Sequence, residues 1–511
     1  MSANKNDPKD AVKMTSGLDS QTQADLDALM RKYDRESNTR VWEGWQRWAV
    51  GAIMVIFSLY CIGMTLFYSG LPETRLAAFL AMIVFIGFLT YPVKKGHVKV
   101  NSMPWYDIIL MLVGTSCFLY FAFNALPIIK LATRIQTHHV IIGAIGILVL
   151  IELCRRCVGV PILCVLGALL IYTFYNQLSY NPSLYQALKN IVYKLFYTTN
   201  GVIGTPVNVC YTYIVLFIIF GAFLERTGIA NFFIALANRL AGWSAGGPAK
   251  VAVISSALCG MVSGSSVGNT VTTGSVTIPM MKKTGYHPDF AGAVEAAAST
   301  GGQIMPPIMG AAAFLMAEYM DLPYATVAVK AILPAVLYFT GIFISVHLEA
   351  KKLGLKGIPR SELPRFKYLI RNVYLLLPLV FLIWMVTANI RSLQFSAAIA
   401  ILISIAVSLV GTIRDASAEV RETKTGSVAG ITAKKTGRMI LDSLEAGGKG
   451  SITVAVACAM AGMIAGCITV TGLASKLISG VIAISSAIPN PTLSLLLALF
   501  LTMLCCIVLG M

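Results

Sequence analysis

The fold of this chain is decided by residues 245–320, which read AGGPAKVAVISSALCGMVSGSSVGNTVTTGSVTIPMMKKTGYHPDFAGAVEAAASTGGQIMPPIMGAAAFLMAEYM. The stretch contains an apolar run, Val251–Met261, of only 11 residues. A helix of that length rises about 16 Å, half of a hydrocarbon core roughly 30 Å thick. Residues 262–274 are rich in glycine and polar residues and do not favour a continuous lipid-facing helix, and Lys250 and Lys282 flank the unit. We therefore expect a re-entrant hairpin with its tip at mid-membrane.

The second half of the stretch predicts a membrane helix that is broken at its centre. Segments at Asp289–Thr300 and Ile308–Met320 flank the glycine- and proline-rich sequence Gly301–Pro307. Glycine and proline interrupt the helix and leave backbone carbonyl groups free. Inside a membrane, irregular backbone is tolerated only where it is buried in protein or lines a cavity. We therefore expect the hairpin tip to meet the break.

The composition sets the class of protein. Of 511 residues, 57% are hydrophobic and 12% are charged, whereas soluble domains carry about 45–50% apolar and about 25% charged residues. A soluble enzyme, a fibrous protein and a disordered chain are therefore excluded. We predict an all-α polytopic membrane protein with about a dozen membrane segments. The net charge of +17 is carried between apolar runs, so it indicates membrane topology and no nucleic-acid partner.

Ordinary membrane spans are expected outside the irregular stretch, at Trp48–Phe67, Leu76–Tyr91, Tyr106–Phe123, Val140–Leu153, Val160–Tyr175, Tyr213–Phe223, 373–389, 394–412 and 452–470. Residues 183–200 predict an interfacial helix. Basic residues collect in cytoplasmic loops. A cytoplasmic N-terminus places three basic groups on that side: Arg40 and Arg47; Lys94, Lys95 and Lys99; and Arg155 and Arg156. Lys130 and Arg134 fall on the opposite side and do not fit this orientation.

An internal repeat is carried by Thr227-Gly228-Ile229-Ala230 and Thr471-Gly472-Leu473-Ala474. In each copy a span precedes the motif, an amphipathic stretch follows it, and a proline opens a new apolar run. That run reaches a glycine 37 residues after the threonine in the first copy and 39 residues after it in the second. The copies start on opposite sides of the membrane, so we predict an inverted repeat, which is typical of transporter folds. The second copy stops where its hairpin tip is expected, so we expect a truncated chain with a half-site missing after Met511.

The hairpin tip and the break offer the chemistry of a secondary transporter. Helix N-termini attract anions and freed carbonyl groups coordinate cations, and a hard cation such as sodium prefers oxygen ligands. Glu295 and Ser299 share one helix face, and a carboxylate within a membrane is a functional candidate. Two alternatives remain open: Glu295 could fix packing through a hydroxyl or backbone group, and the small residues of 262–274 could serve close helix packing.

Residues 245–320 resemble the large membrane subunit of tripartite ATP-independent periplasmic (TRAP) transporters, and the resemblance covers nearly the whole chain after residue 45. The sequence of Glu152–Gly159, ELCRRCVG, resembles the end of the small-subunit portion in the branch where both subunits are fused and paired with TAXI-type binding proteins. The family implies sodium-driven import of an organic anion, often a carboxylate, across the bacterial inner membrane. It also implies a periplasmic solute-binding protein that delivers the substrate, and an elevator-type transporter whose transport domain moves against a scaffold.

The resemblance also implies roles for particular residues. The first hairpin tip would be formed by Gly264, Ser265, Ser266, Asn269 and Thr270, and the broken-helix side of the sodium and substrate site by Ser299, Thr300, Gly301, Gln303 and Pro306. Ser263, Thr273 and Glu295 complete the expected set. No cofactor is expected. Sodium is expected as the coupling ion, and it would be held by Gly264, Ser265, Asn269 and Gly301.

With this resemblance the chain divides into six regions. These are a cytoplasmic polar tail (1–46), small-subunit-like membrane helices (47–180), an interfacial connecting helix (181–207), a first repeat with hairpin and broken helix (208–350), basic cytoplasmic linkers with scaffold helices (351–450), and an incomplete second repeat (451–511). Membrane lipid is the remaining expected partner.

Three other functions are alternatives to this one. An elevator-type anion and sodium symporter that works without a binding protein fits the same residues. An intramembrane hydrolase would use Ser263 of Gly260-x-x-Ser263-Gly264, but a serine nucleophile needs a base within reach, and the five histidines lie in or near predicted loops or helix ends. We therefore expect no enzyme. An inert scaffold leaves the hairpin and the broken helix unexplained.

Overall fold

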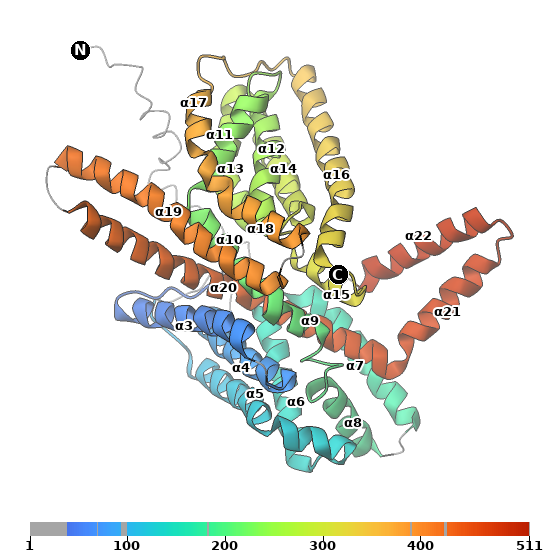
Figure 1. Cartoon of the computed structure of the whole chain (residues 1–511). Coiled ribbons are helices and arrows are strands. Elements are labelled where there is room, and N and C mark those ends of the chain that lie inside the picture. The colour runs from blue at the N-terminus through green and yellow to red at the C-terminus, as the bar shows by residue number, and fades with distance from the viewer. Residues whose placement is uncertain are drawn as a thin grey trace. The chain divides into compact units, whose positions relative to one another are not determined.

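The computed structural model describes residues 38–68, 70–93, 100–180, 183–388, 391–423 and 427–509. Helices joined by turns and short loops account for all of these residues, with no strand among them (Figure 1). They belong to two compact units. Unit 1 contains Met54–Phe67 and Thr212–Ser451, and unit 2 contains the described residues of Ala24–Ile53, Tyr68–Tyr211 and Ile452–Met511.

Nine helical stretches in the described ranges are long and apolar enough to cross a membrane: Trp45–Phe67, Pro72–Thr90, Trp105–Arg134, Val160–Tyr180, Thr205–Arg226, Tyr324–Lys352, Phe366–Thr387, Leu393–Arg414 and Val428–Thr471. The prediction of an all-α polytopic membrane protein is therefore confirmed. Tyr324–Lys352 lies outside the spans that we predicted. The expected span Val140–Leu153 lies within a helix, Thr137–Cys157.

Unit 2 contains helices from the first part of the chain together with the last two helices. Its elements are α4 (Pro72–Thr90), α5 (Trp105–Leu131), the 3-10 turn η1 (Ala132–Arg134), α6 (Thr137–Cys157), α7 (Val160–Tyr180), α8 (Leu184–Phe196), α9 (Thr205–Val209), α21 (Leu473–Ser486) and α22 (Pro491–Leu509). Helix α4 packs on α5, α5 on α6, and α6 and α7 on α8. Helix α8 is amphipathic, as expected of an interfacial helix: it buries Ala187, Ile191 and Leu195 and exposes Leu184 and Leu188.

Charged side chains are buried together at one end of unit 2. Asp107, in the first turn of α5, forms ion pairs with Arg40 and Arg156, and all three side chains are at most 3% exposed. Arg156 Nη2 lies 2.8 Å from Asp107 Oδ1, and Arg156 Nε lies 2.9 Å from Glu152 Oε1. A buried charge is tolerated when it is paired. The cluster therefore holds Arg40 and the C-terminal end of α6 at the same end of the unit. The predicted topology places both of these segments on the same side of the membrane. Lys94, Lys95 and Lys99 lie outside the described residues.

The internal repeat is visible in the local backbone of both copies. Gly228 precedes α11 (Ile229–Ala241) with a φ of +83°, and Gly472 precedes α21 with a φ of +64°. These values lie in the left-handed region, which glycine adopts at the least cost. The helices that follow have 13 and 14 residues. Gly510 and Met511, where the second tip is expected, lie outside the described residues, and the inverted orientation stays a prediction.

Unit 1 contains the irregular stretch. Its elements are α10 (Val215–Arg226), preceded by the π-helical turn η2 (Cys210–Ile214), then α11, α12 (Gly247–Ser263), α13 (Ser266–Thr284), α14 (Pro288–Gly301), the 3-10 turn η3 (Gly302–Ile304), α15 (Ala311–Tyr319), α16 (Tyr324–Lys352), α17 (Phe366–Asn372), the 3-10 turn η4 (Val373–Leu376), α18 (Leu377–Thr387) and α19 (Leu393–Thr423). Helices α3 (Trp45–Phe67) and α20 (Val428–Thr471) and the turn η2 contribute residues to both units.

Small side chains hold the centre of unit 1 together. Helix α12 contacts α13, α14 and α16. In Figure 1, α12, α13 and α14 lie side by side in green. Their shared core is rich in fully buried alanines, namely Ala249, Ala252, Ala291, Ala298 and Ala350. Small residues let helix backbones approach closely. Helices in a membrane associate through such contacts, because lipid is as apolar as the side chains and no hydrophobic effect drives the helices together. The hairpin and the first half of the broken helix therefore form one packed group.

The basic region 351–450 contains long helices. Helix α19 continues to Thr423, and α20 starts again at Val428. The charged part of this region is rich in alanine, glutamate, lysine and arginine. These residues have high helix propensity, so the helices extend well beyond the apolar residues.

Candidate functional site

The hairpin consists of α12 and α13, which are joined by only two residues, Gly264 and Ser265. A helical hairpin is what we expected, but the irregular part is much shorter than residues 262–274. Helix α12 continues to Ser263, and α13 begins at Ser266. The expectation that this run lacks continuous helix is therefore wrong beyond the two-residue turn.

Polar side chains in α13 bond to the helix itself, which explains why the helix persists. Ser265 is the N-cap residue, and its Oγ accepts a hydrogen bond of 3.2 Å from the N–H of Gly268. Further along, the hydroxyl groups of Thr270 and Thr284 donate to the carbonyl four residues back. Such back-bonding makes serine and threonine compatible with a helix.

The hairpin touches the break through backbone atoms. Gly264 has a φ of +60°, and a Cβ at this residue would lie 2.4 Å from the carbonyl oxygen of Met309. One turn earlier, a Cβ at Gly260 would lie 2.3 Å from Gly302 Cα. Real Cβ atoms do not come closer than 3.0 Å, so both positions require glycine. Gly260 in α12 and Gly264 in the turn therefore let the tip meet the break at van der Waals distance.

Asn269 lies where the hairpin and the break meet. Its side chain is 1% exposed, and its Nδ2 donates to the carbonyl oxygen of Ser256 at 2.8 Å. The same nitrogen would lie within 3.3 Å of a Cβ placed at either Gly260 or Gly302. Asn269 Oδ1 is buried and has no hydrogen-bond donor among the described residues. A buried acceptor without a donor is costly, and an oxygen of this kind suits a hard cation.

The break separates α14, which ends at Gly301, from α15, which begins at Ala311. The N–H of Gly310 donates to the carbonyl oxygen of Gln303 at 2.7 Å, which folds the break back on itself. Gln303 Nε2 donates to Ser266 Oγ at 3.3 Å, which links the break to the first turn of α13. The broken helix is therefore confirmed, and its centre is attached to the hairpin tip.

Glu295 is fully buried in α14 and accepts hydrogen bonds from four hydroxyl groups, those of Ser256, Thr273, Thr277 and Ser299. The Ser256 bond is 2.7 Å long and the Ser299 bond 3.2 Å. Gly274 leaves room for the carboxylate, since a Cβ there would lie 2.9 Å from Glu295 Cγ. No ion pair involves Glu295 among the described residues. The carboxylate thus ties both arms of the hairpin to α14.

The residues expected at the site fall into two clusters. The tip cluster comprises Ser263, Gly264, Ser265, Ser266, Asn269 and Gln303. The carboxylate cluster comprises Thr273, Glu295 and Ser299. The others are placed differently: Thr270 and Thr300 donate to carbonyls of their own helices, Gly301 packs on the ring of Tyr338, and Pro306 lines an apolar cavity.

Four residues that contribute to these clusters are missing from the predicted set: Ser256, Gly260, Thr277 and Gly302. Ser256 stands with Ser255 inside an otherwise apolar run, and two neighbouring hydroxyls in such a run are a usable signal. Thr277 follows Thr273 by four residues and so shares its helix face. The contact between Gly260 and Gly302 joins residues far apart in the chain, and no local pattern predicts it.

These features define a polytopic helical membrane protein in which a helical hairpin meets a broken helix, an arrangement of secondary transporters. Comparison with protein families agrees. The model of the family described as "Tripartite ATP-independent periplasmic transporter, DctM component" matches residues 145–511. Because the match covers more than half of the chain, the chain belongs to this family. It is a family of transporter permeases and not of enzymes.

Curated relatives carry corresponding names. The chain is 27% identical over 151 residues to the C4-dicarboxylate TRAP transporter large permease protein DctM of Vibrio cholerae, covering 30% of this chain and 32% of the relative. It is 27% identical over 147 residues to the protein of the same name from Pseudomonas aeruginosa (29% and 34%), and 23% identical over 146 residues to the sialic acid TRAP transporter large permease protein SiaM of Vibrio cholerae (29% and 34%). The chain spans about a third of the length of these relatives.

Proposed function

We propose that this chain is the permease of a sodium-coupled transporter that imports a small organic anion. A TAXI-type periplasmic solute-binding protein delivers the anion, and the permease lies in the bacterial inner membrane with its N-terminus in the cytoplasm. The proposal rests on the family to which the chain belongs and on the tip cluster.

One observation carries the sodium part of the proposal. Asn269 Oδ1 is buried at the contact between hairpin and break and lacks a donor in the described chain. Sodium would satisfy this oxygen, and hydroxyl and carbonyl oxygens of the tip cluster supply further ligands of the type that hard cations prefer. The proposed ligands are Gly264, Ser265, Asn269 and Gly301. Sodium bound there would hold the hairpin against the break.

The anion part rests on the first turn of α13. The N-terminus of a helix presents unpaired N–H groups and a partial positive charge, which favour a carboxylate. Helix α13 begins at the tip, next to Asn269 and Gln303. Two of the relatives are named for C4-dicarboxylate and for sialic acid, and a carboxylate is accordingly the substrate class that we propose here.

The sodium site is tested by replacing its ligands in the full-length transporter. Asn269→Ala and Ser265→Ala should each raise the sodium concentration for half-maximal uptake by about tenfold or more, while the protein level in the membrane is unchanged. Ser275→Ala is the matched control, since Ser275 Oγ bonds to the carbonyl of Thr272 on the same helix, away from the tip. Unchanged sodium dependence in both tip variants would refute the assignment.

The binding-protein part is tested by uptake into proteoliposomes. Transport should require a TAXI-type protein added on the outside and loaded with its anion. Uptake of the free anion by the permease alone would instead favour the binding-protein-independent symporter. Mass spectrometry of the anion that co-purifies with the binding protein identifies the substrate.

The elevator mechanism makes a separate prediction about the hairpin. A cysteine in place of Ser266, in a background without reactive cysteines, should react with a membrane-impermeant maleimide from the periplasmic side in one state and from the cytoplasmic side in the other. Sodium should change the ratio of the two reactions. Labelling from one side under all conditions would contradict an elevator.

A further inference from the structure

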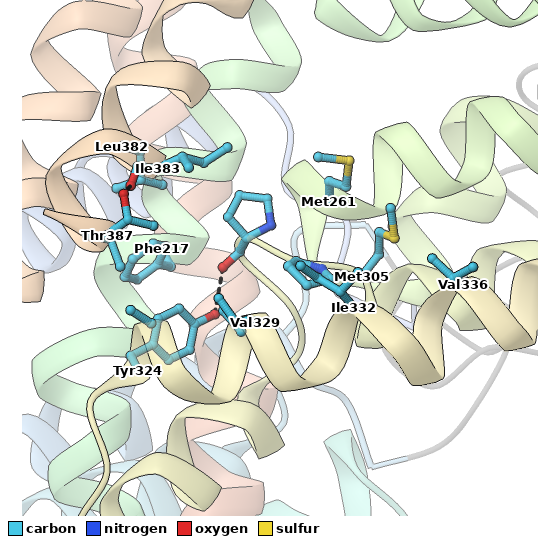
Figure 2. A pocket seen from close by; sticks show the side chains of 15 residues that line it. Phe217, Met261, Met305, Tyr324, Val329, Ile332, Val336, Leu382, Ile383 and Thr387 are labelled. Carbon is cyan, nitrogen blue, oxygen red and sulfur yellow. Dashed lines mark hydrogen bonds between the residues drawn. The ribbon is translucent and has the colours of Figure 1, made fainter.

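Unit 1 contains a cavity of about 360 Å³ beside the break (Figure 2). Helices α10, α12, α16 and α18 form its walls together with Met305, Pro306 and Pro307. Helix α16 contributes residues spaced as one helix face, namely Ala325, Ala328, Val329, Ile332 and Val336. The volume lies at the lower end of the roughly 300–1,000 Å³ of small-molecule sites. The cavity is therefore large enough for a small ligand.

The polar side chains that line this cavity are already hydrogen bonded. The hydroxyl of Tyr324 lies 2.7 Å from the carbonyl oxygen of Pro307, a contact drawn as a dashed line in Figure 2, and 2.6 Å from the carbonyl oxygen of Ile308. Thr387 Oγ1 donates to the carbonyl oxygen of Ile383 at 2.7 Å. The other lining side chains are aliphatic, aromatic, proline or methionine. A carboxylate or sugar would lose its hydration here without gaining partners, so the cavity does not fit the anion proposed above.

The cavity is continuous with a surface suited to lipid. Val329, Ile332 and Val336 line it and yet remain 58%, 49% and 50% exposed. On the same helix, Leu333 and Leu337 lie outside the lining and are 66% and 63% exposed. Both α16 and the segment that contains α18 are long and apolar enough to cross a membrane. In a bilayer, the medium that adjoins the open side of this cavity is hydrocarbon.

We propose that the cavity binds one acyl chain of a membrane phospholipid. An acyl chain needs no polar partner, can enter sideways between α16 and α18, and gains van der Waals contacts that a void cannot supply. The bound chain lies against Met305–Pro307, and the flanking residues Gly302 and Met309 touch the hairpin. This site is separate from the tip cluster and does not depend on which anion is transported.

The test uses the full chain in liposomes that contain a trace of phosphatidylethanolamine with a diazirine at the end of one acyl chain. After irradiation, mass spectrometry should find adducts concentrated on Ile332, Val336 and Ile383. Ala328→Trp fills the cavity, and Val329→Trp fills its mouth at a half-exposed position that tolerates bulk. Each excluded methylene weakens binding by roughly fourfold, so blocking three of them should reduce these adducts on the order of 50-fold.

Leu333→Trp is the matched control, because it adds the same side chain to α16 outside the cavity and should leave the adducts unchanged. Thermal unfolding of each variant shows whether it has folded. The proposal is overturned if adducts on Leu333 and Leu337 are as frequent as those on Ile332 and Val336, or if both filled variants keep wild-type labelling, since either result describes ordinary annular lipid.

Discussion

The contact between Gly260 and Gly302 can be tested by adding one methyl group. A Cβ at Gly260 would lie 2.3 Å from Gly302 Cα, whereas ordinary contacts begin at 3.4 Å, a difference of 1.1 Å. The atom that is struck belongs to the backbone, so no side chain can turn aside to relieve the clash. Binding constellations tolerate displacements of about 0.5 Å. Gly260→Ala should therefore push the hairpin away from the break by about twice that tolerance.

Two effects of Gly260→Ala oppose each other in stability. Overpacking costs about 1–3 kcal/mol, and alanine in place of glycine within a helix recovers about 0.5–1 kcal/mol. We expect a net loss of between about 0 and about 2.5 kcal/mol. The effect on transport should be larger, because Asn269 lies against both glycines. The sodium concentration for half-maximal uptake should rise about tenfold, and sodium should no longer raise the thermal unfolding temperature in detergent.

Gly292→Ala is the control for this experiment. Gly292 is a glycine in α14, and a Cβ there would have no atom within 4 Å. The substitution should stabilise the protein by about 0.5–1 kcal/mol and leave uptake unchanged. If Gly260→Ala gave the same result as Gly292→Ala, close contact between hairpin and break would be unnecessary, and our account of the tip cluster would be wrong.

Three further predictions concern stability, each measured by thermal unfolding of the purified chain. Glu295→Ala should cost about 2–4 kcal/mol, since each buried hydroxyl left without an acceptor costs about 1–3 kcal/mol and some of the four can donate to carbonyls of their own helix instead. If Glu295→Gln, which keeps one acceptor oxygen, cost as much, the pairing with hydroxyl groups would be unimportant. Asp107→Asn should cost about 3–5 kcal/mol, because it leaves the buried Arg40 without its carboxylate and Arg156 with Glu152 alone. Glu152→Gln, at a residue whose side chain is 27% exposed, should cost about 1 kcal/mol or less; equal losses would contradict the burial argument. Gly228→Ala and Gly472→Ala should each cost about 1 kcal/mol from backbone strain alone, as neither Cβ would meet another atom; no loss in either would contradict the repeat's shared turn.

The hairpin and the break could be predicted from sequence because chain length and residue type limit what they can form. Eleven apolar residues cannot cross a membrane as a helix, and the glycines and prolines of 301–307 interrupt any helix that contains them. The extent of α13 could not be predicted in the same way. Serine and threonine bond either to their own helix or to distant partners, and only the three-dimensional surroundings decide between these.

The site was less predictable than the fold because its contacts join distant segments through small atoms. Gly260 and Gly302 meet at their Cα atoms, and nothing in either local sequence identifies the other. Glu295 shows the same limit: its cost within a membrane marks it as a functional candidate, but its partners on α12 and α13 appear only after folding. The structure also supports the alternative reading in which neighbouring hydroxyl groups fix Glu295 in place.

Ser256 connects the tip cluster and the carboxylate cluster in one hydrogen-bond network. Its carbonyl oxygen accepts from Asn269 Nδ2 in the tip cluster, and its hydroxyl donates to Glu295 in the carboxylate cluster. Sodium that engages Asn269 would therefore act on a side chain whose other end is fixed, through Ser256, to the carboxylate that ties both arms of the hairpin to α14. A ligand can shift a conformational equilibrium only by its different affinity for the two states. Because Glu295 holds both arms of the hairpin to α14, sodium bound at the tip, as proposed above, would stabilise the closed contact with the break and would not merely move the hairpin as a whole.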